Sequence, residues 1–451
     1  MILTKRSKKI ISLVIIVSTI ILSSLLTFSL SVFIMQVFLA LLTLPIIMKK
    51  DYKWAKLYAL IFVVSIIFVF LVYIANNLYY GSPYYIGGSD DINFENEGKV
   101  IVNSGMINPV RILESELIGR WHNATFFSLY ISFLIRFSDL FGGYSTFLPR
   151  IMNVYYLIWS CFIFQYLFKK YANFNEQKIY ISIAIFALTP NIQYINSHVF
   201  RDIFNLLQLL SIIFLFDRLM VNKQYLKKLL IIGIMAFLIF ITYYTRENSL
   251  VFACAICILI LEEKLGLKNR YIIMLIIPMI MMSNFVEVIE LRQFIEFYTM
   301  YVLNLTGDGL SSYVFREPLL PFGIILRALY AFITPFPNFL GLFKEPSKGF
   351  FDAILLIVYF GVLIQILAIP FILKRLSRFD WLSLSFLVCF VAIIATTFTF
   401  RHVLFYYPFL VAVGVDGYIT SSKRFRQLAL FCSGFMGFFL AITYVLLKFF
   451  S

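Results

Sequence analysis

The stretch IISLVIIVSTIILSSLLTFSLSVFIMQVFLALLTLPIIM, residues 10–48, decides the fold class of this chain. It contains no charged residue, and Lys9 and Lys49 stand directly on either side of it. A helix that crosses a bilayer needs about 20 apolar residues, so this stretch is long enough for two crossings. A cleavable signal peptide has one much shorter apolar segment. We therefore predict a hairpin of two membrane spans that stays in the mature protein.

The composition of the whole chain agrees with this prediction. Of the 451 residues, 61% are hydrophobic and 14% are charged, whereas soluble domains carry about 25% charged residues. This balance excludes a soluble enzyme, a nucleic-acid-binding domain, a disordered chain and a disulfide-stapled secreted module. All five cysteines fall inside predicted spans, so we expect neither disulfides nor a thiolate metal site.

Apolar runs of roughly 17 to 25 residues mark the membrane spans along the chain. Thirteen candidates follow, which predicts an all-α, polytopic transmembrane helical bundle of about 13 spans. The candidate spans are 10–28, 30–48, 55–78, 148–168, 178–196, 203–220, 229–245, 248–264, 271–287, 351–374, 380–399, 402–420 and 428–449.

The charge distribution orients these spans. Lys and Arg concentrate in short cytoplasmic loops, and placing Lys5–Lys9 inside puts seven short basic segments on that side. They hold 24 Lys or Arg and, together with Asp416, 7 acids, whereas everything on the opposite side holds 14 Lys or Arg and 16 acids. The net charge of +15 is therefore explained by topology. We expect no nucleic-acid partner.

Two outer segments each contain an apolar run that is not a membrane span. The charge distribution assigns both ends of each segment to a side of the membrane, and the predicted spans already account for every crossing between those ends. The first, 124–141, carries polar residues at spacings of three and four, which is typical of one helical face. The second, 321–334, contains Arg327 and is bounded by two prolines. We expect both segments to be helices that lie in the outer interface of the membrane.

Ionisable residues gather near the predicted outer ends of the spans, where they could converge on one cavity. Charged groups at membrane depth are costly and are usually functional or paired. The alternative is that they are surface charges paired locally, Arg246 with Glu247 or Arg201 with Asp202. The group consists of Asp90, Asp91, His198, Arg201, Asp202, Arg246, Glu247, Arg401 and His402.

Three stretches carry motifs whose order and sidedness agree with one known family. The first runs from GSDDINFENEG, which starts at Gly88, through NATFFSLYISFLIRF to FGGYSTFLPRIMNVYYLIWSCFIFQYLFKKY. The others are ALTPNIQYINSHVFRDIFNLLQLLSIIFLFDRL, 187–219, and RHVLFYYPFLVAVGV, 401–415. These stretches resemble glycosyltransferase family 39 and its relatives in the GT-C superfamily. The first is similar to that family's acidic pair in the first outer loop, its interfacial helices, and a Gly-x-Ser and an Arg that lead into the next span.

The chain departs from the family pattern at several positions. The acidic pair is Asp90-Asp91 rather than Asp-Glu, Phe94 stands where a Tyr is usual, and Arg246 and Glu247 occupy a turn that often carries a Lys. The hairpin 10–48 precedes what would be the first helix. The resemblance implies three parts: an N-terminal hairpin 1–54, a GT-C-like catalytic region 55–420 with outer loops 80–147 and 288–350, and a loop plus last span 421–451.

The resemblance implies an integral-membrane glycosyltransferase of the hexosyl or pentosyl transferase class. It would move a sugar from a polyprenyl-phosphate or polyprenyl-diphosphate donor to a glycan or lipid acceptor on the extracytoplasmic face. Asp90 would be the general base, with Asp91 as its neighbour or as the base itself. Substrate binding would fall to Arg201, Arg246 and Arg401 on the donor phosphate, with Asp202, Glu247 and His402 beside them.

Two alternative functions stay open, a polysaccharide repeat-unit polymerase and a transporter or flippase of lipid-linked oligosaccharides. A transporter would be expected to carry ionisable residues near the bilayer midplane and inverted repeats, and neither is evident here. Paired carboxylates can attract a divalent metal, and all three histidines fall on the predicted outer side. Histidine is also an ordinary polar residue at membrane interfaces, so we expect no metal site and no certain cofactor, with a divalent metal as the open alternative. The abundance of Ile, Lys, Asn and Phe is typical of an AT-rich bacterial genome. For a bacterial chain, the family resemblance implies the bacterial cytoplasmic (inner) membrane and a role in cell-envelope polysaccharide biosynthesis.

Overall fold

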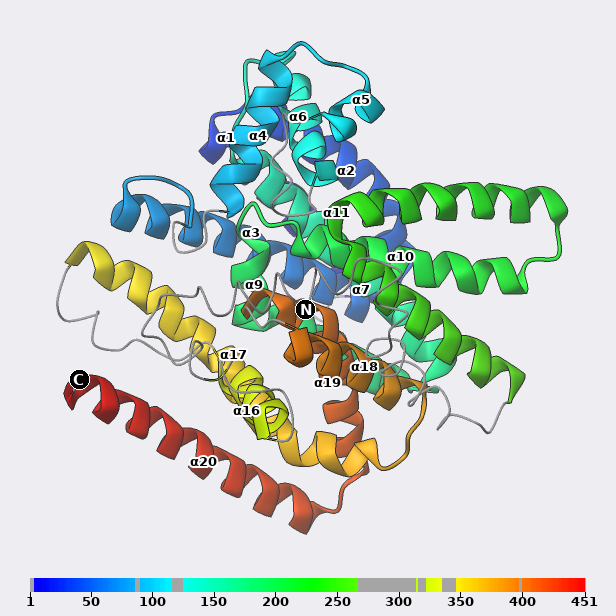
Figure 1. Ribbon diagram of the computed structural model, residues 1–451, viewed down its shortest axis with the longest axis vertical. Coiled ribbons are helices and arrows are strands. Elements are labelled where there is room, and N and C mark those ends of the chain that lie inside the picture. The colour runs from blue at the N-terminus through cyan, green and yellow to red at the C-terminus, as the bar shows by residue number, and fades with distance from the viewer. Residues whose placement is uncertain are drawn as a thin grey trace. The chain divides into compact units, whose positions relative to one another are not determined.

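The computed structural model describes residues 4–85, 90–115, 125–266, 314, 322–334, 346–396 and 400–450, which are mostly helical and contain no strand (Figure 1). The helices are α1 (Lys5–Thr27), α2 (Leu30–Met48), α3 (Tyr52–Tyr80), α4 (Asp90–Asn103), α5 (Pro109–Glu114), α6 (Thr125–Asp139), α7 (Phe147–Tyr171), α8 (Glu176–Leu188), α9 (Pro190–Asn196), α10 (Asp202–Val221), α11 (Tyr225–Leu265), α16 (Ile324–Ile333), α17 (Pro346–Leu376), α18 (Trp381–Thr396), the 3-10 helix η4 (Phe400–His402), α19 (Val403–Thr420) and α20 (Lys423–Phe450).

Nine helices among the described residues are long and apolar enough to cross a membrane. This confirms an all-helical, multi-pass membrane protein, while a count of 13 spans stays a prediction. The nine are Arg6–Thr27, Leu30–Met48, Tyr52–Tyr80, Phe147–Tyr171, Asp202–Val221, Tyr225–Arg246, Lys348–Leu376, Val403–Thr420 and Lys423–Thr443.

The remaining predicted spans have different outcomes. The stretch 178–196 was expected to be one helix, which is wrong: it is divided into α8 and α9 because Thr189 is extended (φ −63°, ψ 129°) before Pro190. Proline lacks an N–H and disfavours a helical residue before it. The stretch 380–399 contains the short helix α18, 248–264 lies within α11, and 271–287 lies outside the described residues.

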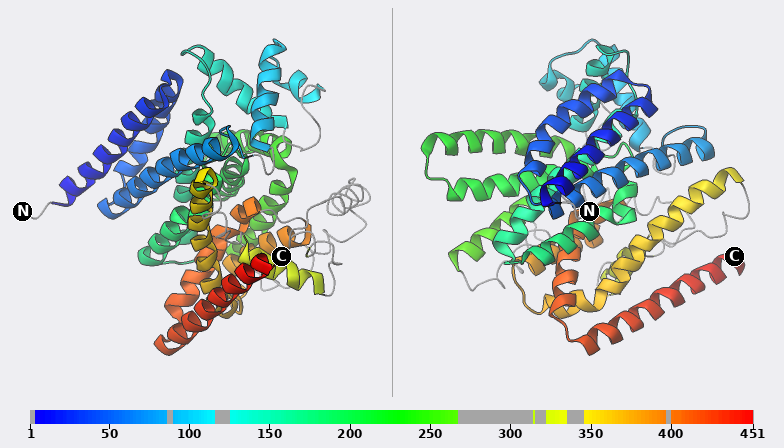
Figure 2. Two further views of the ribbon diagram at one scale, coloured as in Figure 1. Left: turned by 90° about the vertical axis from the view of Figure 1, so that its left-hand side faces the viewer. Right: turned by 180° about the vertical axis from the view of Figure 1, so that it is seen from behind.

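The chain divides into two units, and the first comprises Met1–Leu167, Ile183–Val251 and Asn338–Val358. In this unit α1 and α2 form the predicted hairpin and pack on α3 (Figures 1 and 2). The two arms of the hairpin are tied by the buried Gln36, whose Nε2 donates to Ser23 Oγ (3.1 Å) and Ser24 Oγ (2.9 Å). A buried amide needs such partners because hydrocarbon offers none.

Helix α6, expected to lie in the interface, packs against α4 and α5 in the first unit (top of Figure 1). The polar stripe predicted for this helix includes Ser128 and Ser132, and both are buried. Ser128 donates to Glu97 of α4, and an added Cβ on Gly98 would lie 2.7 Å from Ile131, so the two helices approach closely along this face. The stripe is therefore a packing surface, and a membrane position for α6 stays a prediction.

The second unit comprises Phe168–Ser182, Phe252–Pro337 and Tyr359–Ser451. Within it α18 packs on α16 and α19, and α19 lies directly against α17. A Cβ on Gly417 would lie 2.2 Å from the carbonyl oxygen of Phe371, so only glycine allows this helix contact. A Cβ on Gly437 of α20 would lie 3.3 Å from the side chain of Leu363 and 3.7 Å from that of Ile366, so α20 also lies close to α17 at this point.

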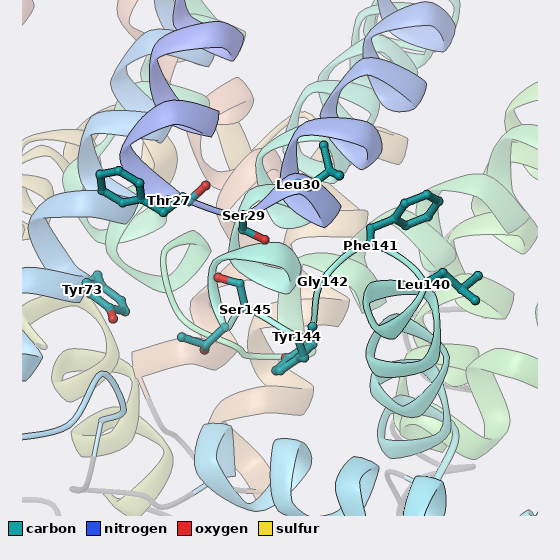
Figure 3. Close-up of a pocket in the computed structure, with 12 residues that line it drawn as sticks. Thr27, Ser29, Leu30, Tyr73, Leu140, Phe141, Gly142, Tyr144 and Ser145 are labelled. Atoms are coloured by element: carbon teal, nitrogen blue, oxygen red, sulfur yellow. The ribbon is translucent and has the colours of Figure 1, made fainter.

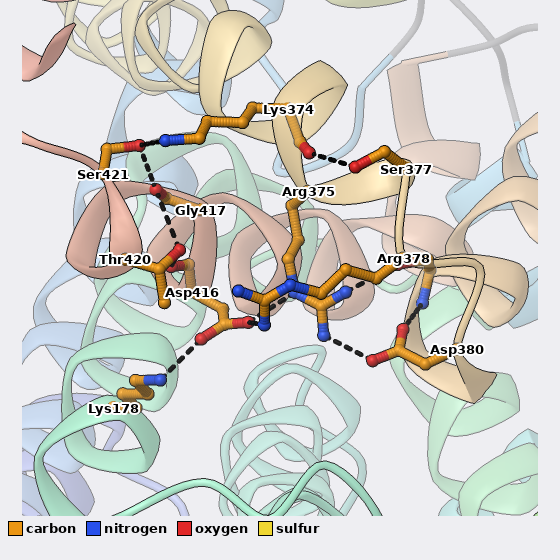
Figure 4. A network of polar contacts seen from close by, with 11 residues as sticks. Lys178, Lys374, Arg375, Ser377, Arg378, Asp380, Asp416, Gly417, Thr420 and Ser421 are labelled. Carbon is orange, nitrogen blue, oxygen red and sulfur yellow. Dashed lines mark hydrogen bonds and ion pairs between the residues drawn. The ribbon is translucent and has the colours of Figure 1, made fainter.

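A buried ion network joins the ends of the helices in the second unit (Figure 4). Asp416 of α19 accepts from Lys178 of α8 (2.6 Å), from Arg375 of α17 and from Arg378 (3.3 Å). Arg375 also binds Asp380. Burial by itself would raise the pKa of Asp380, but hydrogen bonds from Arg375 and from the N–H of Ser383 outweigh it and hold the pKa below its usual value. All these residues come from segments assigned to one side of the membrane by their charge.

We expect Asp416→Asn to lower the free energy of unfolding by about 3 kcal/mol, because it leaves the buried Arg375 and the partly buried Lys178 without their shared carboxylate. The measurement is thermal unfolding in detergent, followed by a thiol-reactive fluorophore that reports exposure of the buried Cys389. Asp380→Asn is the matched control, because Asp380 is more exposed and pairs with one cation. The ion pair of Asp380 stabilises the fold at pH values above the usual carboxylate pKa, and this stabilisation is lost as the pH falls through the lowered pKa of Asp380. Equal melting temperatures for Asp416→Asn and the unmodified chain would contradict this role.

Candidate functional site

The acidic pair lies at the start of α4, in the first unit. Asp91 is fully buried, and its two oxygens accept the backbone N–H groups of Tyr85 and Ile92, each at 3.0 Å. Asp90 is half-buried. A helix N-terminus favours negative charge because its first N–H groups are unpaired and its dipole is positive there. The two carboxylates therefore differ: Asp91 fastens the chain that enters α4, and Asp90 is the more accessible one.

The turn between α9 and α10 lies beside this acidic pair. The ring of Tyr85, whose N–H binds Asp91, stands edge-on to His198 with centroids 5.9 Å apart. His198 in turn stacks on Phe200 (4.7 Å) and its Nδ1 lies 2.8 Å from the carbonyl oxygen of Tyr194. The segment that precedes α4 and the turn between α9 and α10 are therefore in contact through Tyr85.

Two arginines and an aspartate complete the cluster from α10 and α11. Arg201 Nη1 donates to the carbonyl oxygen of Thr245 (2.7 Å), and its guanidinium stands 5.9 Å from the ring centre of Phe94 on α4. Arg246 Nη1 lies 3.0 Å from Asp202 Oδ1. Arg246 has extended backbone (φ −169°, ψ 97°) inside α11, which places a break where the sequence predicts a turn.

The ion pair found here differs from the local pairs that the sequence offered as an alternative. Arg246 pairs with Asp202, 44 residues away, so the two turns are held together by charge. Asp90, Asp91, Arg201, Asp202 and Arg246 therefore belong to one end of the first unit. The side chain of Glu247 lies outside the described residues.

Arg401 and His402 belong to the second unit. They lie in the 3-10 helix η4, which contacts α19, and both are half-buried. Their predicted part in substrate binding stays a prediction.

A second buried carboxylate, Glu95, was not among the predicted site residues. Glu95 is 1% exposed and accepts hydrogen bonds from three hydroxyls, those of Tyr84, Tyr144 (2.9 Å) and Thr146 (2.6 Å). It follows Asp91 by four residues, which places both on one face of a helix. That spacing was the signal in the sequence that could have identified it.

Arg150 was likewise missing from the predicted site, although it stands in the motif FLPR at the start of α7. It is fully buried and donates to the carbonyl oxygens of Ser197 (2.8 Å) and Pro83 (2.5 Å). Its guanidinium therefore ties the loop after α3 to the turn before α10. Arg150 thereby fixes the position of the loop that leads to the acidic pair relative to the turn that carries His198.

The phenols that bind Glu95 stay protonated. Loss of solvent raises the pKa of Tyr84 and of Tyr144, and the neighbouring Glu95 carboxylate raises both further. Arg150 acts in the opposite direction on both but does not outweigh these causes. Each phenol therefore remains a hydrogen-bond donor to Glu95 throughout the physiological pH range.

The interior next to the turn of α9 and α10 contains neutral polar groups. Four buried amides have neither their nitrogen nor their oxygen hydrogen-bonded among the described residues: Asn191, Asn196, Asn205 and Gln208. An unpaired buried amide costs about 1–3 kcal/mol, so such groups in folded proteins usually hold water or a ligand. Hydroxyl groups, which both donate and accept, would satisfy them.

The cluster thus combines carboxylates, cations and neutral amides at one end of a membrane-helix unit. Within the ranges that the structure describes, no group of three or more His, Cys, Asp or Glu side chains could hold a metal ion. No family model, curated protein or solved structure matches the chain. The arrangement can remove a proton at a carboxylate and stabilise an anion at a guanidinium.

We expect Glu95→Ala to lower the free energy of unfolding by about 3 kcal/mol, because it leaves three hydroxyl donors without their acceptor. The readout is heat-induced labelling of Cys161, which is fully buried in the same unit. Glu97→Ala is the matched control: it removes a carboxylate from the same helix, one that accepts from the Ser128 hydroxyl and does not bind the three hydroxyls held by Glu95. A melting temperature for Glu95→Ala no lower than that for Glu97→Ala would refute this anchoring role.

Proposed function

We propose that the protein is an integral-membrane glycosyltransferase that transfers a sugar from a polyprenyl-(di)phosphate donor to an acceptor hydroxyl outside the cytoplasmic membrane. The observation that carries this proposal is the gathering of Asp90 and Asp91 with Arg201 and Arg246 at one end of the first unit. The transfer needs a base for the acceptor and a cation for the departing phosphate. Both kinds of group are supplied by the same cluster.

The membrane setting supports a lipid-linked donor. Nine helices in the described part of the chain are long and apolar enough to cross a bilayer, and a polyprenyl chain would be dissolved in the same phase. The excess of Lys and Arg in the opposite loops favours a cytoplasmic position for those loops. The cluster would then face the extracytoplasmic side of a bacterial inner membrane.

Asp90 is the general base in this proposal. It is half-buried at the positive end of α4, whereas the oxygens of the fully buried Asp91 already accept two backbone N–H groups. Asp90 takes the proton as the acceptor oxygen bonds to the anomeric carbon of the donor, and the bond from that carbon to the phosphate oxygen breaks. Asp91 acts by positioning, because it holds the loop and the helix start in register.

Arg201 and Arg246 stabilise the phosphate that leaves. A guanidinium has five N–H donors in a fixed plane, so Arg201 can hold the Thr245 carbonyl and a phosphate oxygen together. Asp202 orients Arg246 through their 3.0 Å ion pair. Sugar hydroxyls would satisfy the buried amides of α9 and α10, which supports a carbohydrate rather than an apolar substrate.

We expect Asp90→Asn to reduce transfer by 10²-fold or more, because general-base catalysis contributes about 10²–10⁴-fold. The assay uses membranes from host cells and their own labelled pool of lipid-linked glycans, with the product profile read by mass spectrometry. Asp139→Asn is the matched control, since Asp139 is exposed at the end of α6 in the same unit. Asp91→Asn should also lose activity but keep the pH dependence that Asp90→Asn abolishes.

The product profile also separates this function from its alternatives. Loss of single sugars from the lipid-linked glycans in Asp90→Asn supports a single-sugar transferase. Accumulation of complete, unpolymerised repeat units would identify a polymerase with the same base. An unchanged profile in a correctly folded Asp90→Asn and Asp91→Asn double variant would refute the enzyme and favour a transporter of lipid-linked oligosaccharides.

A further inference from the structure

A pocket of about 770 Å³ lies in the first unit, between the turn that joins α1 to α2 and the segment that precedes α7 (Figure 3). Ligand pockets are usually about 300–1,000 Å³, so this volume suits a small molecule or a few linked units. One part of the wall comes from the N-terminal hairpin, and another from residues 140–146. The lining residues are Thr27, Phe28, Ser29, Leu30, Tyr73, Leu140, Phe141, Gly142, Gly143, Tyr144, Ser145 and Thr146.

The pocket wall carries no charged side chain, but half of its residues carry a hydroxyl. Ser29 of the hairpin turn and Ser145 of the second segment both present their side chains to it (Figure 3). Gly142 and Gly143 have φ of +91° and +109°, and a Cβ on either would meet no atom within 4 Å, so a ligand can approach this backbone. A wall of this kind suits a neutral, hydroxyl-rich ligand and disfavours a phosphate or a metal ion.

An aromatic residue is held at the pocket at a conformational cost. Phe28, the C-cap of α1, has φ of +49° and is 97% exposed. Glycine is the usual residue in this left-handed conformation, and a bulky side chain there is strained. Tyr73 and Tyr144 add further rings to the wall. Aromatic rings beside hydroxyls offer both the apolar and the polar contacts that a sugar ring presents.

The pocket is physically connected to the candidate site. Tyr144 and Thr146 line it, and both hydroxyls bind Glu95 on α4. Glu95 lies one helical turn beyond the acidic pair. The hairpin and the second segment are joined as well, since Ser31 Oγ donates to the Gly143 carbonyl oxygen at 3.3 Å. A ligand bound here would therefore lie within one connected framework with Asp90 and Asp91.

We propose that this pocket binds a neutral stretch of the acceptor glycan, away from the reacting sugar. The inference rests on the proposed function in one respect, namely that the bound glycan is the acceptor of the transfer. Binding itself requires no catalysis. The hairpin, which precedes the GT-C-like region, supplies part of the pocket and would thereby hold a chain that extends from the site. The acidic pair Asp90 and Asp91 selects the hydroxyl that reacts, and the pocket selects the neighbouring sugars of the same glycan.

The test measures binding by the purified full-length chain in nanodiscs. The probe is the mixture of oligosaccharides released by mild acid from the host's polyprenyl-linked pool, separated into neutral and acidic fractions, with native mass spectrometry as the readout. We use an Asp90→Asn background so that no turnover occurs. Phe28→Gly should weaken binding of the neutral fraction about tenfold or more, and it should fold normally because glycine suits the left-handed position.

Phe379→Gly is the matched control: Phe379 also has positive φ (+44°) but belongs to the second unit. It should leave glycan binding unchanged. Ser145→Trp, which fills the pocket, is a second variant and should abolish binding. Three results would each overturn this proposal. They are equal binding by Phe28→Gly and by Phe379→Gly, no binding of any neutral oligosaccharide, and a preference for the acidic fraction.

The pocket and the proposed function can fail separately in this design. If Asp90→Asn loses transfer but Phe28→Gly binds normally, the pocket is refuted and the enzyme stands. If Asp90→Asn retains transfer while Phe28→Gly loses binding, the glycan site stands and the catalytic assignment is refuted.

Discussion

Hydrocarbon offers no partner to a polar group, and this constraint governs every buried charge in the protein. Asp416 is buried among helices of spanning length only because Lys178 and Arg375 bind it. Asp202 is buried because Arg246 binds it. The ends of the helices are therefore fastened by charges, while their lengths are held by apolar packing. The candidate site depends on this division, because charged side chains that stabilise helix ends are already where a substrate in water can reach them.

In the proposed function, rigidity and reactivity are assigned to different residues of the same cluster. Asp91, Glu95 and Arg150 are fully or almost fully buried, and they bind backbone groups or hydroxyls of neighbouring loops. Asp90 is more open and stands at the end of a helix whose position those bonds fix. Preorganised groups cost no rearrangement during a reaction. A base can thus be held in place by neighbours that take no part in proton transfer.

The hairpin adds a second surface to this framework. Its turn contributes Phe28 and Ser29 to a neutral pocket, whereas the acidic pair Asp90 and Asp91 stands at the start of α4. If both proposals hold, neutral and charged recognition are separated along one framework. This arrangement suits a polymeric sugar, in which one hydroxyl reacts while the rest of the chain needs only to be held.

The sequence by itself determined the apolar helices, their order and the break at Arg246, because burial in lipid demands long apolar runs and leaves charges at their ends. It also identified Asp90, Asp91, Arg201 and Asp202 as one candidate group. Only the tertiary structure decided that Arg246 pairs with Asp202, that Ser128 faces α4 and that Glu95 collects three hydroxyls. A sequence pattern shows which groups need a partner. Which partner each one has depends on helix contacts between residues far apart in the chain.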